Sequence, residues 1–271
     1  MFAYTLKDTL ITVDHVDAMR GDRLVLRDIA VDIKDIVRAD LAGQGQVVGF
    51  LGPSGIGKTT LLRVIAGLDA PSRGRVLIDG APAEAGKVGV VFQSYPLFAH
   101  RRVLGNCVLA AQARGLDRDE ATAQARALLE RFGVGDRAHA WPSQLSGGQR
   151  QRVAIVQQLL RGHTYLLMDE PFSGLDPVAK REACKLISEV ARTGERVTIV
   201  IVTHDIAAAI RCSDHLWLMG RDPGQDGARI VDTIDLIERD LAWRPDCDRL
   251  PGFGELVREL EARFDGLGGT S

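Results

Sequence analysis

The stretch that decides the fold reads Gly52-Pro53-Ser54-Gly55-Ile56-Gly57-Lys58-Thr59. An apolar run, 47–51, precedes it, and a run of helical composition, 60–66, follows it. Strand, glycine-rich turn and helix form the context in which a G-x-x-x-x-G-K-[ST] pattern binds phosphate. The glycines let successive backbone N–H groups point at one anion, and the helix N-terminus adds the positive end of its dipole. The stretch therefore predicts a phosphate-binding loop.

The polar side chains of this loop have separate expected roles. The Lys58 ammonium is expected to reach the β- and γ-phosphates of a nucleotide, and the Thr59 hydroxyl is expected to bind Mg²⁺. We expect the nucleotide contacts of this region to come from Gly52, Pro53, Ser54, Gly55, Ile56, Gly57, Lys58, Thr59 and Thr60.

The composition favours a globular protein that does not bind nucleic acid. The chain has 271 residues, of which 45% are hydrophobic and 26% charged, and its formal net charge is −2. Nucleic-acid-binding proteins usually carry a basic excess, which this chain lacks. Its four cysteines, Cys107, Cys184, Cys212 and Cys247, form no C-x-x-C pair, which favours reduced structural thiols over a zinc site or disulfides.

The sequence predicts a cytosolic location. The first residues lack the basic-then-apolar layout of a secretory signal. The longest apolar runs, such as 197–202, are as long as a strand and fall short of the ~18 residues that a membrane span needs. We therefore expect any work at a membrane to require partner subunits.

The hydrophobic pattern alternates between strands and helices. It predicts a parallel sheet with helices on both faces, interrupted by a helical region over 102–132 that continues into the helix after Ser146. Residues 35–42 read as a polar insertion, and 266–269 as a disordered end. The other expected strands are 10–13, 23–26, 29–33, 75–78, 88–92, 165–168, 197–202 and 215–219, and the other expected helices are 178–192, 206–212 and 255–264.

Two carboxylates, Asp169 and Glu170, end the predicted strand 165–168. Functional groups of open α/β sheets lie at the carboxyl ends of the strands, so both are expected near the phosphate loop. We expect Asp169 to hold Mg²⁺, and Glu170 to orient or deprotonate the attacking water.

A second phosphate-binding helix start is predicted at Leu145-Ser146-Gly147-Gly148-Gln149. A serine N-cap alone is an ordinary structural feature. It does not explain two glycines in a first helical turn, where each costs about 1 kcal/mol relative to alanine. Free N–H groups at a positive dipole end suit an anion.

From about Thr9 to Thr233 the chain closely resembles the nucleotide-binding subunit of an ABC (ATP-binding cassette) transporter. The motif at 145–149 matches the signature of that family. Gln93 matches its Q-loop, Ser173-Gly174-Leu175-Asp176 matches its D-loop, and His204 matches its switch histidine.

The resemblance implies a fold. It is an α/β P-loop NTPase core of the ABC ATPase kind, with a parallel sheet, an antiparallel β subdomain and an inserted α-helical subdomain. We expect the ATP-binding core at 1–93 and 159–233, with the antiparallel β subdomain at its N-terminal end. The helical subdomain is expected at 94–158 and a C-terminal extension at 234–271.

The resemblance also implies a mechanism. Two subunits form a head-to-tail dimer around ATP and Mg²⁺, so that the loop of one copy faces Ser146, Gly147 and Gly148 of the other. Gln149 and Asp176 are expected to contribute to nucleotide binding. His204 is expected to contact the γ-phosphate, and Gln93 to sense Mg²⁺ and the attacking water. Lys58, Gln93, Glu170 and His204 form the expected catalytic group, and Thr59, Gln93 and Asp169 the expected metal contacts.

The implied partners are transmembrane permease subunits, a second ATPase subunit and a solute-binding protein, with no nucleic acid. A groove around 95–106 would receive a helix of the permease. The subunit would lie in the cytoplasm, peripherally on the inner face of the cell membrane. The end of the core, near 221–231, resembles the nitrate, sulfonate and taurine importer group. A lipid-trafficking or export complex, a non-transport ABC ATPase and a generic P-loop kinase remain alternatives.

The sequence departs from the family pattern at several positions. Arg20 stands where the family places an aromatic residue that stacks on adenine, and a guanidinium also stacks on a π-face. Phe2 and Tyr4 are alternatives for that contact. Val156-Gln157-Gln158 stands where the family usually has Ala-Arg-Ala, and we assign no catalytic consequence to this change.

Overall fold

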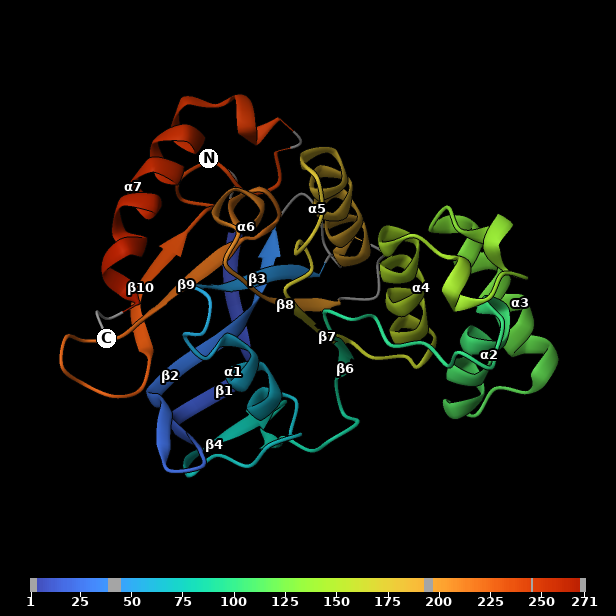
Figure 1. Cartoon of the computed structure of the whole chain (residues 1–271), viewed down its shortest axis with the longest axis horizontal. Coiled ribbons are helices and arrows are strands. Elements are labelled where there is room, and N and C mark those ends of the chain that lie inside the picture. The colour runs from blue at the N-terminus through green and yellow to red at the C-terminus, as the bar shows by residue number, and fades with distance from the viewer. Residues whose placement is uncertain (1–3, 39–44, 193–196, 245, 269–271) are drawn as a thin grey trace.

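The computed structural model describes residues 4–38, 45–192, 197–244 and 246–268. Figure 1 shows a large lobe built on two sheets and a smaller lobe of helices beside it. The strands of the first sheet are β1 (Tyr4–Arg20), β2 (Arg23–Arg38), β4 (Arg73–Ile78) and β5 (Ala81–Pro82). Those of the second are β3 (Gln46–Leu51), β6 (Gly89–Val91), β7 (Tyr165–Asp169), β8 (Thr198–Thr203), β9 (His215–Gly220) and β10 (Arg229–Asp235). The α-helices are α1 (Lys58–Ile65), α2 (Val103–Ala113), α3 (Arg118–Arg131), α4 (Gly147–Leu160), α5 (Pro177–Ala191), α6 (Ile206–Cys212) and α7 (Pro251–Leu267).

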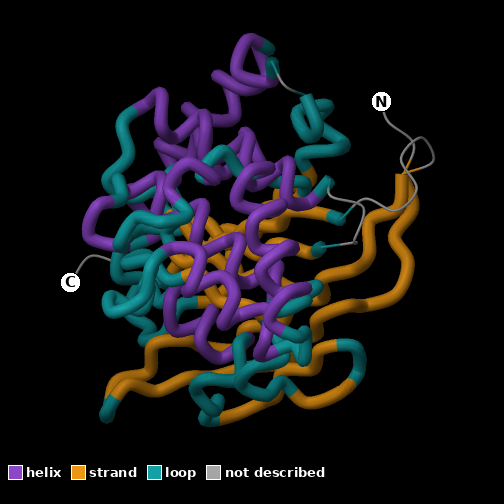
Figure 2. Tube along the Cα trace, turned by 90° about the vertical axis from the view of Figure 1, so that its right-hand side faces the viewer, coloured by secondary structure: helices purple, strands orange, loops and turns teal. Residues whose placement is uncertain are grey.

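The antiparallel sheet has the order β2-β1-β4-β5. Its hairpin of β1 and β2 is longer than the sequence predicts. The three short strands expected before residue 34 belong to two strands of 17 and 16 residues. The expected polar insertion at 35–42 is wrong for 35–38, which continue β2; residues 39–42 lie outside the described residues. Pairing with the start of β1, from Tyr4↔Arg38 to Leu6↔Ile36, holds this segment extended. Figure 2 shows these strand ends projecting past the helices.

The second sheet has the order β10-β9-β3-β8-β7-β6. Its strands are parallel except β10, which runs antiparallel to β9 at one edge and which sequence analysis missed. Alternate residues of its strands enter two different hydrophobic clusters. Val48 and Val200 pack with α1 and the antiparallel sheet, whereas Val47 and Ile199 pack with α5 on the other face. Helices therefore cover both faces, as expected.

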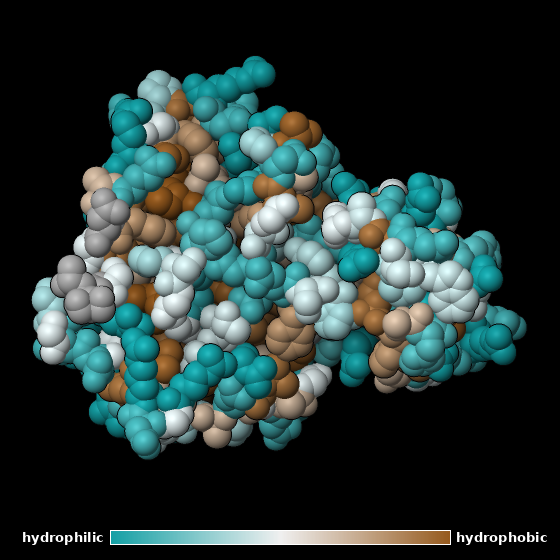
Figure 3. Space-filling model, in the orientation of Figure 1, coloured by the Kyte–Doolittle hydropathy of each residue, from teal (hydrophilic) through white to brown (hydrophobic). Residues whose placement is uncertain are grey.

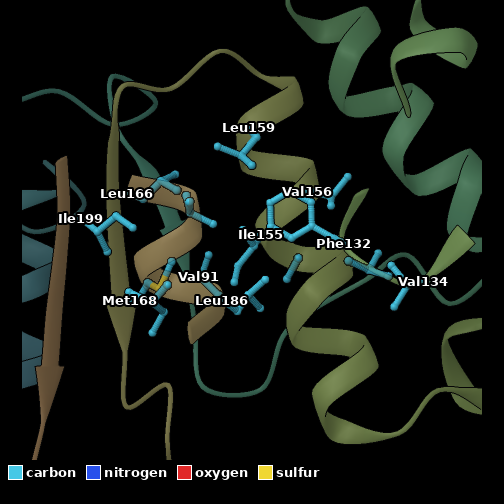
Figure 4. Packing of buried hydrophobic residues seen from close by; sticks show 14 of the residues in the cluster. Val91, Phe132, Val134, Ile155, Val156, Leu159, Leu166, Met168, Leu186 and Ile199 are labelled. Carbon is cyan, nitrogen blue, oxygen red and sulfur yellow. The ribbon is translucent and has the colours of Figure 1, made fainter. Parts of the chain in front are cut away.

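The smaller lobe consists of α2, α3 and α4. Its hydrophobic core is continuous with the cluster on the α5 face of the parallel sheet, because buried residues of α2, α3 and α4 belong to the same cluster as those of β7 and α5. Figure 4 shows Ile155 and Leu159 of α4 directed toward Leu166 of β7, with Phe132 and Val134 on the far side of the helix. Val156, one of the departures from the family pattern, is fully buried there.

The C-terminal helix α7 packs against β9, β10 and α6 through Phe253, Leu256 and Leu260. The expected disordered end is wrong for Gly266 and Leu267, which are helical; Gly269 lies outside the described residues. The helix end is fixed by the backbone N–H of Arg221, which donates to the Leu267 carbonyl at 3.0 Å.

Candidate active site

The loop between β3 and α1 is shaped by glycines. Gly55 and Gly57 have φ values of +76° and +118°. A Cβ on Gly57 would lie 2.9 Å from side-chain atoms of Val25 and Leu26, so the close approach of β2 also requires glycine there. Gly57 is the N-cap of α1 and provides no side-chain acceptor, which leaves the first N–H groups of the helix without a capping side chain. The Lys58 side chain, 5% exposed, donates from Nζ to the carbonyls of Gly52 at 2.9 Å and Pro53 at 3.0 Å.

Thr59 and Asp169 meet beside this loop. The Thr59 hydroxyl donates to Asp169 Oδ1 at 3.0 Å, which joins the start of α1 to the end of β7. Burial raises the pKa of Asp169, and the hydrogen bond from Thr59 partly opposes that shift. A hydroxyl and a carboxylate are the hard oxygen ligands that Mg²⁺ prefers, together with phosphate oxygens and water. No group of three or more His, Cys, Asp or Glu side chains arranged to hold a metal occurs among the described residues. The pair therefore fits Mg²⁺ held jointly with a phosphate.

Glu170 is the centre of the polar network. Its Oε1 lies 3.2 Å from Lys58 Nζ. Its Oε2 accepts from the Thr203 hydroxyl at 3.1 Å and from the backbone N–H of His204 at 3.3 Å, and lies 2.9 Å from His204 Nδ1. Glu170 has φ +48°, a conformation that turns its side chain out of the strand direction. The parallel pairing of β7 with β8 brings Glu170 and His204 together at the carboxyl ends of the two strands.

Gln93 lies at the rim of the same site. Its Nε2 donates to the Ser173 hydroxyl at 2.9 Å. Two residues later, the Tyr95 hydroxyl donates to the Pro171 carbonyl at 3.2 Å. These bonds connect the segment that leads into the helical lobe with the turn after Glu170.

A cavity of about 510 Å³ brings together most of these groups, although Asp169 and Thr203 are not among its lining residues. Arg20 lines it, as do Ser54, Gly55, Gly57, Lys58, Thr59, Thr60, Gln93, Glu170 and His204. Sequence analysis missed four more lining residues, Arg23, Val25, Ser173 and Arg221. Ser173 was visible as part of the D-loop match. Arg221 directly follows β9, and the resemblance near 221–231 gave it no role at the nucleotide.

The residue proposed to contact adenine, Arg20, lines this cavity. Arg20 lies there with Arg23 and Val25, and none of the described lining residues is Phe, Tyr or Trp. The alternative contact Tyr4 is wrong. It starts the strand that Arg20 ends, its hydroxyl donates to Asp235 at 2.7 Å, and its ring meets His215 edge-on. Phe2 lies outside the described residues.

The second predicted phosphate-binding helix start lies apart from the cavity. Ser146 caps α4: its hydroxyl accepts from the Gln149 N–H at 3.3 Å, and the Gln149 side chain accepts from the Ser146 N–H at 3.0 Å. A Cβ on Gly147 or Gly148 would meet no atom within 4 Å. Packing within this chain therefore does not explain either glycine. Asp176 likewise does not line the cavity, and caps α5 through the N–H groups of Val178 and Ala179.

Comparison with known proteins identifies the family. A family model described as ABC transporter matches residues 41–173. The glutamine transport ATP-binding protein GlnQ of Escherichia coli K12 is 38% identical over 217 residues, which cover 76% of this chain and 86% of GlnQ. The chain belongs to the ABC transporter family of ATP-binding subunits. The ABC ATPase fold and the binding of ATP, predicted from the motifs, are thereby confirmed.

Other relatives of this ATP-binding subunit differ in length. The uncharacterized ABC transporter ATP-binding protein YtlC of Bacillus subtilis is 38% identical over 257 residues, which cover 93% of this chain and 96% of YtlC. The Fe(3+) ions import ATP-binding protein FbpC of Rhizobium etli is also 38% identical, over 79% of this chain. The aligned part spans only 60% of FbpC.

Solved structures agree with the fold. The cbiO1 protein of Clostridium perfringens, described as part of the ABC transporter complex cbiONQ, superposes with a TM-score of 0.74 and 27% identity, over 96% of this chain and 97% of its own. The ATP-binding cassette MJ0796, solved as a dimer in a post-hydrolysis state with ADP and Pi, superposes with a TM-score of 0.69 and 26% identity, over 84% of this chain and 99% of its own.

Proposed function

We propose that this subunit hydrolyses ATP at the interface of a head-to-tail dimer and thereby powers import of a small solute through partner membrane subunits. The observation that carries the proposal is the contact set of Glu170. One carboxylate contacts the Lys58 ammonium, the Thr203 hydroxyl and His204, and three of these residues, Glu170, Lys58 and His204, line a single cavity. Such an arrangement suits the hydrolysis of a phosphoanhydride, because base, ammonium and imidazole converge at the phosphate loop.

The residues of the chain divide the chemistry. Thr59 and Asp169 would hold Mg²⁺, which would supply positive charge to offset the charge of the transferring phosphate. The ammonium of Lys58 and the free N–H groups at the start of α1 bind the β- and γ-phosphates. The Glu170 carboxylate orients the attacking water and accepts its proton. His204 positions Glu170 through Nδ1 and contacts the γ-phosphate, and Gln93 holds the turn that contains Ser173.

The proposed dimer is supported by the surroundings of Gly147 and Gly148, which have no contact within their own chain that requires glycine. They face open space, yet they occupy the first turn of a helix, where glycine is costly. A partner surface that must approach the backbone closely explains both. We therefore propose that Ser146, Gly147, Gly148, Gln149 and Asp176 complete the nucleotide site of a second copy.

The membrane partners would dock on the helical lobe. A groove there is lined by Arg101, Arg102, Leu104, Gly105 and Val108. Phe98, three residues before Arg101, has an exposed apolar side chain, and Arg102 lies over the exposed ring of Trp141 at 5.3 Å. Figure 3 shows apolar side chains on the visible face where the two lobes join. The structure contains no helix among its described residues that is long and apolar enough to span a membrane. We propose that permease subunits hold the protein peripherally at the cytoplasmic face.

The proposed cargo is a small anion of the nitrate or sulfonate kind, delivered by a solute-binding protein. It rests on the resemblance of the segment near 221–231 alone. Relatives named for iron, spermidine and glutamine transport match this chain about equally well. In the proposed organisation, residues 1–93 and 159–233 form the ATP-binding core, 94–158 the helical subdomain and 234–271 an extension.

The substitution Glu170→Gln tests the proposal. We expect ATP to bind with little change and turnover to fall by about 10²–10⁴-fold, because the amide cannot accept the proton of water. Glu261→Gln, an exposed position on α7, is the matched control and should hydrolyse ATP like the parent protein. Phosphate release at saturating ATP and nucleotide binding by calorimetry provide the two measurements.

Wild-type turnover in Glu170→Gln would refute the role of Glu170. Co-purification with a multi-span membrane protein would support transport, and uptake assays in vesicles would separate import from export or lipid trafficking. Association with ribosomes or DNA alone would favour a non-transport ABC ATPase.

A further inference from the structure

Three of the four cysteines converge in the fold, although they are scattered in the sequence. Cys184 lies on α5, Cys212 ends α6, and Cys247 lies in a short 3₁₀ helix, Cys247–Arg249, before α7. The sulfurs of Cys184 and Cys212 lie 3.7 Å and 3.2 Å from the same Ala208 carbonyl oxygen. Two thiols that share one acceptor are close neighbours, and they belong to two different helices.

A cavity of about 180 Å³ opens onto this pair. It lies on the α5 side of the molecule, and none of the described residues that line it lines the cavity of the ATP site. Both Cys184 and Cys212 form part of its wall. Its lining also includes side chains with exposed ends on α5, among them Arg181, Lys185 and Arg192, which connect the cavity to solvent.

The lining carries more positive than negative groups. The cations are Arg181, Lys185, Arg192, Arg211 and Arg244, and the acids are Glu189, Asp214 and Asp248. Two of these acids have partners of their own, because Asp214 accepts the backbone N–H of Val47 at 2.8 Å and Asp248 lies 3.6 Å from Arg211. Two of the cations are also paired, Lys185 with Glu182 and Arg244 with Asp240, which leaves Arg181 and Arg192 as the main positive side chains of the lining. The cavity therefore presents a positive entrance to a small molecule.

Arg211 brings positive charge to the thiols. Its guanidinium lies over the Phe253 ring at 5.4 Å, and its buried Nε has no hydrogen-bond partner among the described residues. Contact with the Cys212 thiol lowers the pKa of Cys184, burial opposes this shift, and the charge of Arg211 lowers the pKa further. Contact with Cys184 and burial raise the pKa of Cys212. Cys184 is thus the more acidic thiol of the pair, and the one that more readily forms the nucleophilic thiolate.

We propose that Cys184 and Cys212 form a modification site for small anionic disulfides, which enter through the cavity between α5, α6 and the C-terminal extension. The Cys184 thiolate attacks one sulfur of the disulfide, so that a mixed disulfide forms and one thiolate leaves, taking up a proton from solvent. Cys212 then loses its proton and attacks the Cys184 sulfur. The Cys184–Cys212 bond forms, the second thiol leaves, and two electrons have passed from the protein to the reagent.

Only the sulfur-bearing part of the reagent has to enter the cavity. Its carboxylates remain at the entrance beside Arg181 and Lys185. The modified helices are α5 and α6, which begin after Asp176 and Asp205, and the Lys180–Asp205 ion pair at 2.5 Å joins their N-terminal ends.

Charge selectivity tests the proposal. The full-length native protein is treated with oxidised glutathione, an anionic disulfide, or with cystamine, a cationic one, and the products are mapped by mass spectrometry. We expect oxidised glutathione to react at Cys184 at least about tenfold faster at low salt, because a positively lined cleft concentrates anions. Added salt should narrow this difference. Cys107, buried in the helical lobe and absent from the cavity wall, is the internal control and should stay unmodified.

Variants separate the steps. Cys184→Ser should abolish the reaction, and Cys212→Ser should stop it at the mixed disulfide. The double variant Arg181→Gln/Lys185→Gln, which changes exposed positions only, should lose the preference for the anionic reagent. Arg258→Gln on α7 should keep it. Equal rates for the two reagents, modification of Cys107 at the rate of Cys184, or reaction only in urea would each overturn the proposal.

Discussion

At the scale of single residues, two adjacent carboxylates have different surroundings. Asp169 is buried against the Thr59 hydroxyl, and its pKa is raised. Glu170, one residue later, turns toward Lys58 and His204. The change of backbone conformation at Glu170 separates the carboxylate that we propose to bind Mg²⁺ from the one that we propose to accept a proton.

The raised pKa of Asp169 predicts a pH dependence of stability. A carboxyl group whose pKa is raised by folding binds its proton more tightly in the folded protein than in the unfolded chain. The free energy of unfolding therefore falls as the pH rises from the ordinary value of 3.8 through the raised pKa, and this loss persists at pH 7. Asp169→Asn should not show this fall in the free energy of unfolding. The stability of the variant relative to the parent protein should therefore increase as the pH rises through this range.

Urea unfolding of both proteins between pH 4 and pH 7 measures this difference. In the presence of Mg²⁺, Asp169→Asn should also bind nucleotide at least about tenfold more weakly than the parent protein, since the proposed metal site loses a ligand. A stability difference that does not change with pH would contradict the assignment of the buried charge to Asp169.

At the scale of elements, Arg221 links the C-terminal helix to the phosphate loop. Its guanidinium donates to the Gly268 carbonyl at the end of α7 and to the Gly55 carbonyl in the loop, at 3.3 Å and 3.2 Å. Its backbone N–H holds the last carbonyl of the helix. The extension thus contacts the candidate active site through one side chain.

Arg221→Ala should weaken nucleotide binding by about three- to tenfold, since two hydrogen bonds of a partly exposed charged donor are lost. Hydrogen exchange at the last turn of α7 should become faster in the same variant. Arg258→Ala, an exposed arginine of α7, is the matched control and should change neither quantity. Unchanged nucleotide affinity together with faster exchange would show that the link stabilises only the helix.

At the scale of the whole molecule, the phosphate loop and the Ser146 helix start belong to separate surfaces of one chain. In the proposed dimer each nucleotide site takes one of these parts from each copy. The proposal therefore predicts that two defective chains restore each other.

Lys58→Ala removes the phosphate-binding ammonium of the loop. Gly148→Arg introduces a side chain that disturbs the nucleotide site which the Ser146 helix start completes in the other copy, without a clash in its own chain. Each variant alone should lose most ATPase activity while melting within a few degrees of the parent. Their mixture should regain activity, because the mixed dimer contains one intact composite site. Mixed dimers confirmed by mass spectrometry but inactive would contradict a shared site.

Local sequence determined the parts of this protein whose chemistry depends on consecutive residues. The loop at 52–59 and the N-cap at Ser146 could be predicted because backbone geometry and capping act within a few residues. The carboxylates after 165–168 could be placed because parallel strands carry their functional ends to one edge. Only the tertiary structure decided the contacts between distant segments. The length of β2, the site contact of Arg221 and the meeting of Cys184 with Cys212 depend on pairing and packing across the chain, and such contacts leave no periodic mark in either partner.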